Sequence, residues 1–217
     1  EEFNYAGPEC SSLGSPAGWT ASGSWAVGYC GSNNVIPAQC GEIWYWGPNA
    51  SWTNIDVTAK VRVGQNMAGI MARVQDQYNC VVLYFHPGEN RVSWYTRVNG
   101  NWNHIAQGVL GVPYGQAFDA RLEIRGNQYK GYINGELRVT MTDPTYTAGK
   151  VGFYANCVNW NGWFDGLHVS EIGPLNSVFP ATEDTASLRV SSVGKGPGVY
   201  LGGSLTIESN DAAPPKT

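Results

Sequence analysis

Charged residues are scarce in this chain of 217 residues, and long apolar runs are absent. Lys and Arg number 13 and Asp and Glu number 17, which gives a formal net charge of −4. A nucleic-acid-binding protein needs a basic surface to neutralise phosphates, and no Lys- or Arg-rich run occurs. No apolar stretch approaches the roughly 20 residues of a membrane span. The composition therefore predicts neither a nucleic-acid partner nor a membrane span.

Two motifs of hydrolytic catalysis are also missing. Retaining glycosidases need two carboxylates about 5 Å apart, as nucleophile and acid. The chain has no compact Glu-x-Asp-x-Glu motif, and its closest ordered acids, Asp119 and Glu123, share a strand face but lie too far apart for it. No Gly-x-Ser-x-Gly nucleophile elbow occurs. The sequence therefore predicts no catalytic residue, and we expect the chain not to be an enzyme.

Metal-binding cysteine motifs are absent as well. Cysteines occur at positions 10, 30, 40, 80 and 157, and none forms a CxxC pair or a zinc-like cluster with histidine. Cys30 and Cys40 flank the turn-like residues 31–37, which makes them the favoured disulfide; buried free thiols are the alternative. The aromatic, lysine-poor composition favours an oxidising compartment. Because the chain opens on Glu1 without a signal-like segment, we expect a mature secreted protein.

The chain is rich in turn formers and aromatics, with 28 Gly, 9 Trp and 12 Tyr. Residues 57–63 alternate apolar and polar side chains, which predicts a half-buried strand. Asn99-Gly100 and Asn134-Gly135 are strong hairpin signals. Further strands are expected at residues 69–74, 80–85, 91–98, 118–125, 129–133, 151–155 and 164–169. No window shows helical periodicity with caps, so the pattern predicts an all-β, antiparallel two-sheet sandwich or jelly roll.

The composition changes near residue 173, which predicts two parts, residues 1–172 and 173–217. Residues 187–193 and 198–208 alternate around a turn, so the second part is expected to be a β-hairpin extension with a Pro-rich tail. A lone hairpin is marginal in water and must pack on something. Two alternatives stay open: packing on its own domain, or strand addition to a neighbouring copy through residues 187–217, which would build a homo-oligomer or filament.

A series of short motifs runs in order through residues 3–172. They lie at residues 23–27, 68–74, 81–85, 90–100, 121–127, 131–135, 149–155 and 164–169. This series resembles the concanavalin A-like lectin/glucanase jelly roll, and within it the laminin G-like and 3-keto-disaccharide hydrolase-like (family 16 glycoside hydrolase-like) domains. The resemblance covers about four-fifths of the chain. It implies a concanavalin A-like sandwich, but this fold hosts lectins, enzymes and adhesion modules alike.

Candidate carbohydrate-binding residues stand where tryptophan and asparagine gather. Sugar rings stack on indole, and polar side chains read the hydroxyls. The candidates are Trp102, Asn103 and His104 after the first Asn-Gly turn; Asn159, Trp160, Asn161 and Trp163 in a later loop; and Arg73, Tyr95 and Arg97 on strands. Trp102 and Trp160 are expected to be exposed, because both stand among Asn and Gly. Trp25 and Trp94 are expected to be core residues.

Three functions follow from these observations. The first is a secreted, non-catalytic, lectin-like domain with a glycan or polysaccharide as partner. The second is a structural or adhesive subunit of an extracellular assembly, joined through the C-terminal extension. The third is a polysaccharide-active enzyme such as a lyase, for which Arg73, Tyr84, Tyr95 and Arg97 are a candidate set. No cofactor is expected, although Asp165 lies where a jelly roll can hold a structural Ca²⁺.

Overall fold

A computed structural model describes residues 18–27, 35–37, 41–64, 67–156 and 162–173. The chain divides into two compact units, Glu1–Leu175 and Asn176–Thr217. The predicted hairpin extension lies outside the described residues, as do Cys30, Cys40, Asn159, Trp160 and Asn161. Among the described residues the one helical element is the 3-10 turn η2 (Pro87–Glu89), and no helix is long and apolar enough to cross a membrane.

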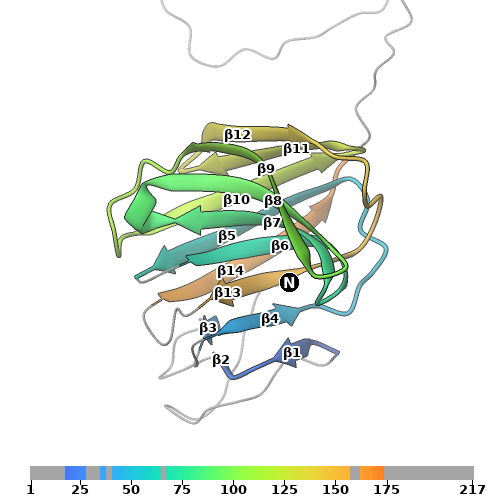
Figure 1. Ribbon diagram of the computed structural model, residues 1–217, viewed down its shortest axis with the longest axis horizontal. Coiled ribbons are helices and arrows are strands. Elements are labelled where there is room, and N and C mark those ends of the chain that lie inside the picture. Colours follow the sequence, from blue (N-terminus) through green and yellow to red (C-terminus); the bar gives the residue numbers. More distant parts are fainter. Residues whose placement is uncertain (1–17, 28–34, 38–40, 65–66, 157–161, 174–217) are drawn as a thin grey trace, which may run out of the picture. The chain divides into compact units, whose positions relative to one another are not determined.

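Two seven-stranded antiparallel sheets face each other (Figure 1). Sheet A has the order β1 (Thr20–Ser22), β4 (Glu42–Trp46), β13 (Lys150–Asn156), β6 (Met67–Asp76), β7 (Asn79–His86), β8 (Arg91–Val98) and β9 (Asn101–Val109). Sheet B has the order β12 (Glu136–Thr142), β11 (Gln128–Ile133), β10 (Ala117–Arg125), β5 (Ile55–Val63), β14 (Gly162–Glu171), β3 (Val35–Pro37) and β2 (Trp25–Val27). This arrangement confirms the predicted all-β jelly-roll sandwich.

Local sequence explains the strands and the turns. In β5 every second residue from Ile55 to Val63 is buried, as the alternation predicts. The turns Asn99-Gly100 and Asn134-Gly135 have positive φ at both residues, 50° and 84° in the first and 50° and 80° in the second. Such backbone angles match the twist of the flanking strands, which is why Asn-Gly favours a tight hairpin.

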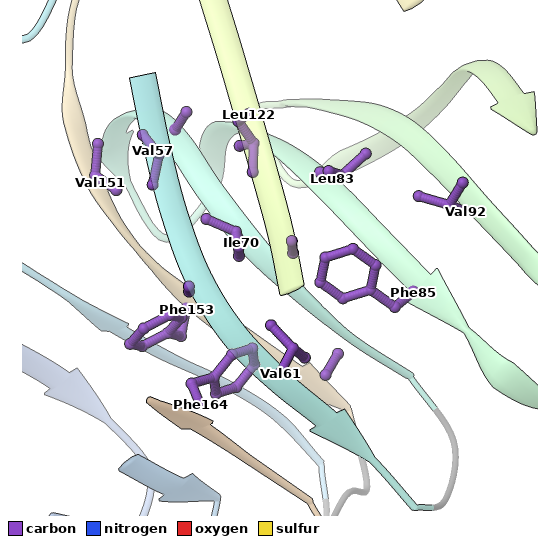
Figure 2. Packing of buried hydrophobic residues seen from close by; sticks show 14 of the residues in the cluster. Val57, Val61, Ile70, Leu83, Phe85, Val92, Leu122, Val151, Phe153 and Phe164 are labelled. Atoms are coloured by element: carbon purple, nitrogen blue, oxygen red, sulfur yellow. The ribbon is translucent and has the colours of Figure 1, made fainter. Parts of the chain in front are cut away.

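The core fills the space between the inner faces of the two sheets. Figure 2 shows Leu83 and Phe85 from sheet A beside Val57, Val61 and Leu122 from sheet B. Across the sandwich, the rings of Phe153 and Phe164 stack with their centroids 4.2 Å apart. The predicted core residues Trp25 and Trp94 lie in the same cluster. Burying each large apolar side chain contributes roughly 1.5–3 kcal/mol, so this layer fixes the position of sheet A on sheet B.

Candidate functional site

The outer face of sheet A carries a second cluster of buried side chains, separate from the core. Because neighbouring residues of a strand point to opposite faces, Val82, Tyr84 and His86 point outward from β7 when Val81, Leu83 and Phe85 enter the core. The cluster consists of Trp44, Trp46, Met71, Val74, Cys80, Val82, Tyr84 and Tyr154, with Met67, Tyr95 and Trp102 packed against it. We call this outer surface of sheet A the aromatic face.

A glycine allows the tyrosines of the aromatic face to meet. Gly69 of β6 pairs with Tyr154 on one side and with Tyr84 on the other. A Cβ at Gly69 would lie 2.6 Å from Cγ1 of Val82 and 2.7 Å from the carbonyl oxygen of Leu83. Without that Cβ, the rings of Tyr84 and Tyr154 approach to 5.1 Å between centroids.

One half of the aromatic face is bridged by Glu42. Its Oε1 accepts hydrogen bonds from Nε1 of Trp102 (3.1 Å) and from the hydroxyl of Tyr154 (2.9 Å). Its Oε2 accepts from Nη2 of Arg97 at 3.1 Å. The Arg97 guanidinium also lies 4.6 Å from the Trp102 ring centroid and 5.3 Å from that of Trp44. We call Glu42, Arg97, Trp102 and Tyr154 the Glu42 bridge.

The Glu42 bridge joins strands that are far apart in the sheet. Four strands separate β4, which carries Glu42, from β9, which carries Trp102. Each strand is rotated by roughly 20° relative to the next, so opposite corners of a wide sheet curl toward each other over one face. The bridge is a contact between two such corners, and it covers the part of the aromatic face beneath it.

The other half of the aromatic face is organised around Arg91, at the start of β8. Its Nε and Nη2 lie 2.9 Å and 2.6 Å from Oε2 of Glu89. Its Nη1 donates to Oγ of Ser93 at 3.1 Å and to the Tyr95 hydroxyl at 3.4 Å. Its Nη2 lies 3.4 Å from Nδ1 of His86. All three nitrogens of this guanidinium therefore contact protein partners. We call these residues the Arg91 cluster.

The pKa of His86 defines the hydrogen-bonding state of the cluster. Burial, and in second place the positive charge of Arg91, lower the pKa of His86 to about 4. The imidazole is therefore neutral above that pH. Because Arg91 can only donate, Nδ1 of His86 is the acceptor and the ring proton lies on Nε2. This buried Nε2–H has no hydrogen-bond partner within the described part of the chain.

Four of the predicted binding residues come together on the aromatic face. Tyr95 and Arg97 extend from β8, and Trp102 and His104 from β9, with the rings of Tyr95 and His104 4.9 Å apart. Asn103 lies between the last two and points to the opposite side of β9. Trp102 is half-buried rather than exposed as expected, because its indole N–H is held by Glu42.

Arg73 and Trp163 do not belong to this group. Arg73 is fully buried, and its guanidinium donates to the backbone carbonyls of Trp52 (2.8 Å), Gly126 (3.2 Å) and Thr147. It ties loops together at one end of the sandwich and is not accessible to a ligand, so its assignment as a binding residue is wrong. Trp163 lies on β14 of sheet B and therefore not on sheet A, which carries Tyr95 and Trp102.

Several residues of the site were not among the predicted binding residues: Glu42, Trp44, Tyr84, His86, Glu89, Arg91, Ser93 and Tyr154. The alternation of residues 91–95 was a usable signal, because it places Arg91, Ser93 and Tyr95 on one strand face. Glu42 carried no such signal, since its partners come from β8, β9 and β13.

Cys80 is also part of the aromatic face, as a buried free thiol. Burial raises the pKa of Cys80 to about 12, although the nearby charge of Arg97 acts in the opposite direction. A thiolate is the reactive form of cysteine, so this side chain is a structural apolar residue.

The outer face of sheet B is polar and ionic by contrast. Arg121 lies between Asp56 and Glu123, and its guanidinium lies 4.6 Å from the ring of Tyr132. A shallow depression beside this group is lined in part by Lys60 and Asp165. Asp165 accepts a hydrogen bond from the backbone N–H of Gly166 at 2.8 Å. Across the described ranges, no group of three or more His, Cys, Asp or Glu side chains is arranged to hold a metal ion.

The fold is shared with solved structures of carbohydrate-binding and carbohydrate-active proteins. The carbohydrate-binding module CBM66 from Bacillus subtilis has a TM-score of 0.61 and 18% identity, over 71% of this chain and 96% of that one. The β-glucanase of Bacillus licheniformis has a TM-score of 0.55 and 14% identity, over 79% and 97%. A putative glycosyl hydrolase from Parabacteroides distasonis has a TM-score of 0.51 and 13% identity, over 71% and 99%.

These structures identify the fold as a concanavalin A-like jelly roll, as the sequence resemblance implied. At such low identities the likeness establishes the fold alone. No protein-family model matches the sequence, and no curated protein matches it.

Proposed function

We propose that this chain is a secreted, non-catalytic carbohydrate-binding module whose ligand binds on the aromatic face of sheet A. The observation that carries this proposal is the combination of partly exposed aromatic rings with fixed polar groups at one place. Tyr95 and Trp102 are half-buried, and the exposed His104 lies beside Tyr95. An ordinary solvent-facing strand surface is polar, whereas a sugar needs both an apolar ring to stack on and groups that bond its hydroxyls.

The Arg91 cluster explains how this surface would bind without large rearrangement. Arg91 donates to the hydroxyl of Tyr95 and to Ser93, which restricts the Tyr95 ring before any ligand arrives. Fixing a side chain in advance reduces the conformational entropy lost on binding. The Glu42 bridge restricts Trp102 in the same way from the other side. The ring of Tyr95 is thus an ordered stacking surface, with His104 available to bond hydroxyls.

A glycosidase is the competing function, because two of the similar structures are hydrolases in name. The one carboxylate pair that shares a partner within the described residues is Asp56 and Glu123, on the outer face of sheet B. Burial alone would raise the pKa of Glu123, but the hydrogen bond from Arg125 and the charge of Lys130 lower it below its ordinary value. A general acid needs a raised pKa. This pair therefore favours an ionic structural role over glycoside hydrolysis.

The test is a glycan array followed by titration calorimetry with the best-bound glycan. We expect Tyr95→Ala to weaken binding roughly tenfold, since a ring stacked on sugar contributes about 1.4 kcal/mol. Tyr132→Ala is the matched control, because this half-buried tyrosine lies on the outer face of sheet B; its affinity should equal that of the wild type.

Analysis of the incubated glycan tests the absence of catalysis. We expect no new reducing ends and no unsaturated uronates after long incubation. Release of either product would make the chain an enzyme, whereas no binding to any glycan would contradict the binding proposal itself.

A further inference from the structure

The Arg91 cluster already contains a carboxylate, supplied by Glu89. This carboxylate lies against the Nε and Nη2 edge of the guanidinium, at 2.9 Å and 2.6 Å. The Glu89 side chain is 62% exposed, whereas that of Arg91 is 22% exposed. Arg91 is the sole hydrogen-bond partner of the Glu89 carboxylate within the described part of the chain. Glu89 therefore covers Arg91 from the solvent side.

Side chains of sheet A hold Arg91 in place, so its position does not depend on Glu89. Ser93 is fully buried and His86 is 4% exposed, and both contact the guanidinium together with Tyr95. The neutral His86 can act as an acceptor there. If Glu89 turned toward solvent, Arg91 would remain in place with one edge open toward the aromatic face.

We propose that the aromatic face recognises an acidic sugar, whose carboxylate replaces that of Glu89 on Arg91. This inference rests on the proposed function and names its ligand class. An exposed ion pair contributes little to stability, because both charges are screened by solvent, so releasing Glu89 costs little. A planar carboxylate matches the fixed fork of an arginine better than a hydroxyl does. The sugar ring that carries the carboxylate then lies over Tyr95.

The direction of the hydrogen bonds also favours an acceptor-rich ligand. Tyr95 accepts from Arg91 and is partly exposed, so its own hydroxyl hydrogen can be donated to a ligand. A neutral hydroxyl in place of Glu89 would leave the positive charge of Arg91 without its counter-ion. A uronate supplies both the charge and the acceptors.

The experiment compares oligogalacturonate with its methyl-esterified form by titration calorimetry. We expect wild-type protein to bind the acid at least tenfold more tightly than the ester. Glu89→Gln removes the competing carboxylate and should strengthen binding of the acid about three- to tenfold, without affecting the ester. Glu136→Gln is the matched control, because Glu136 forms an exposed pair with Arg138 on β12 of sheet B; it should change neither affinity.

A second variant tests Arg91 directly. Arg91→Lys keeps the positive charge but loses the planar pair of N–H donors that matches a carboxylate. It should lower the affinity for the acid about tenfold and leave the affinity for the ester unchanged. Thermal unfolding of each variant establishes that it is folded. Equal binding of acid and ester, or no effect of Glu89→Gln on the acid, would overturn the acidic-sugar inference and leave the binding function intact. Failure to bind any glycan would overturn both.

Discussion

His86 links the chemistry of the Arg91 cluster to the stability of the protein. Its pKa in the folded chain is about 4, against an ordinary value of 6.5, mainly because the ring is buried and secondly because Arg91 is close. Between these two pH values the unfolded chain binds a proton that the folded chain does not. Acidification through this window therefore favours unfolding.

The free energy of unfolding should accordingly be greatest above about pH 6.5 and fall by about 1–3 kcal/mol as the pH decreases to about 4. Urea unfolding at several pH values measures this decline. His86→Gln should flatten it, since Gln accepts from Arg91 without titrating. His168→Gln replaces an exposed histidine on β14 of sheet B, away from His86, and should keep the wild-type decline. If the free energy of unfolding falls equally steeply in His86→Gln, the decline arises from titratable groups other than His86.

At the scale of single elements, the sequence was a good guide to strands and turns. The alternation of β5 and the two Asn-Gly pairs predicted elements that the structure contains. The strand β9 was not predicted; it runs for nine residues beside β8, with a register shift opposite Trp94 and Tyr95. Such a shift depends on the partner strand, so no local pattern encodes it.

Gly69 shows how one residue of β6 determines the surface above it. An added methyl group would collide with the backbone oxygen of Leu83 as well as with Val82, and backbone cannot move aside easily. We expect Gly69→Ala to destabilise the protein by about 1–3 kcal/mol and to separate the rings of Tyr84 and Tyr154. Near-ultraviolet circular dichroism and thermal unfolding measure the two effects.

Gly88→Ala is the control for that substitution. Gly88 is exposed in η2, and a Cβ there meets no atom within 4 Å. Its unfolding temperature should stay within about 2 °C of the wild type, because surface changes without new contacts have small effects. If the two variants lose stability equally, the cause is the general replacement of glycine by alanine and not the collision of a Cβ with Val82 and Leu83 at β6.

At the scale of the whole molecule, the fold was predictable and the site only in part. The order of short motifs indicated the concanavalin A-like sandwich, and the alternation of β8 brought Tyr95 and Arg97 to one face. No sequence pattern indicated the contact between Glu42 and Trp102, because these residues are 60 positions apart and four strands lie between theirs in the sheet. Arg73 was misassigned since its burial arises from loops that meet only in the folded chain.

The Glu42 bridge offers a test of this long-range closure. Arg97 has a side chain only 8% exposed, so removal of its carboxylate partner leaves a buried charge poorly compensated. Glu42→Gln keeps the size of the side chain and one acceptor but removes the negative charge. We expect it to lower the free energy of unfolding by about 1–2 kcal/mol, a modest loss because Glu42 itself is partly solvated.

Glu171→Gln is the matched control at the end of β14, where the glutamate is exposed; it should leave stability unchanged. Tryptophan fluorescence adds a readout of the bridge itself. In Glu42→Gln the indole of Trp102 retains one weaker acceptor, so its emission should shift and its quenching by iodide should increase. Unchanged quenching together with unchanged stability would mean that the two corners of sheet A are held by ring packing around Tyr84 and Tyr154, and that Glu42 contributes nothing measurable to their closure.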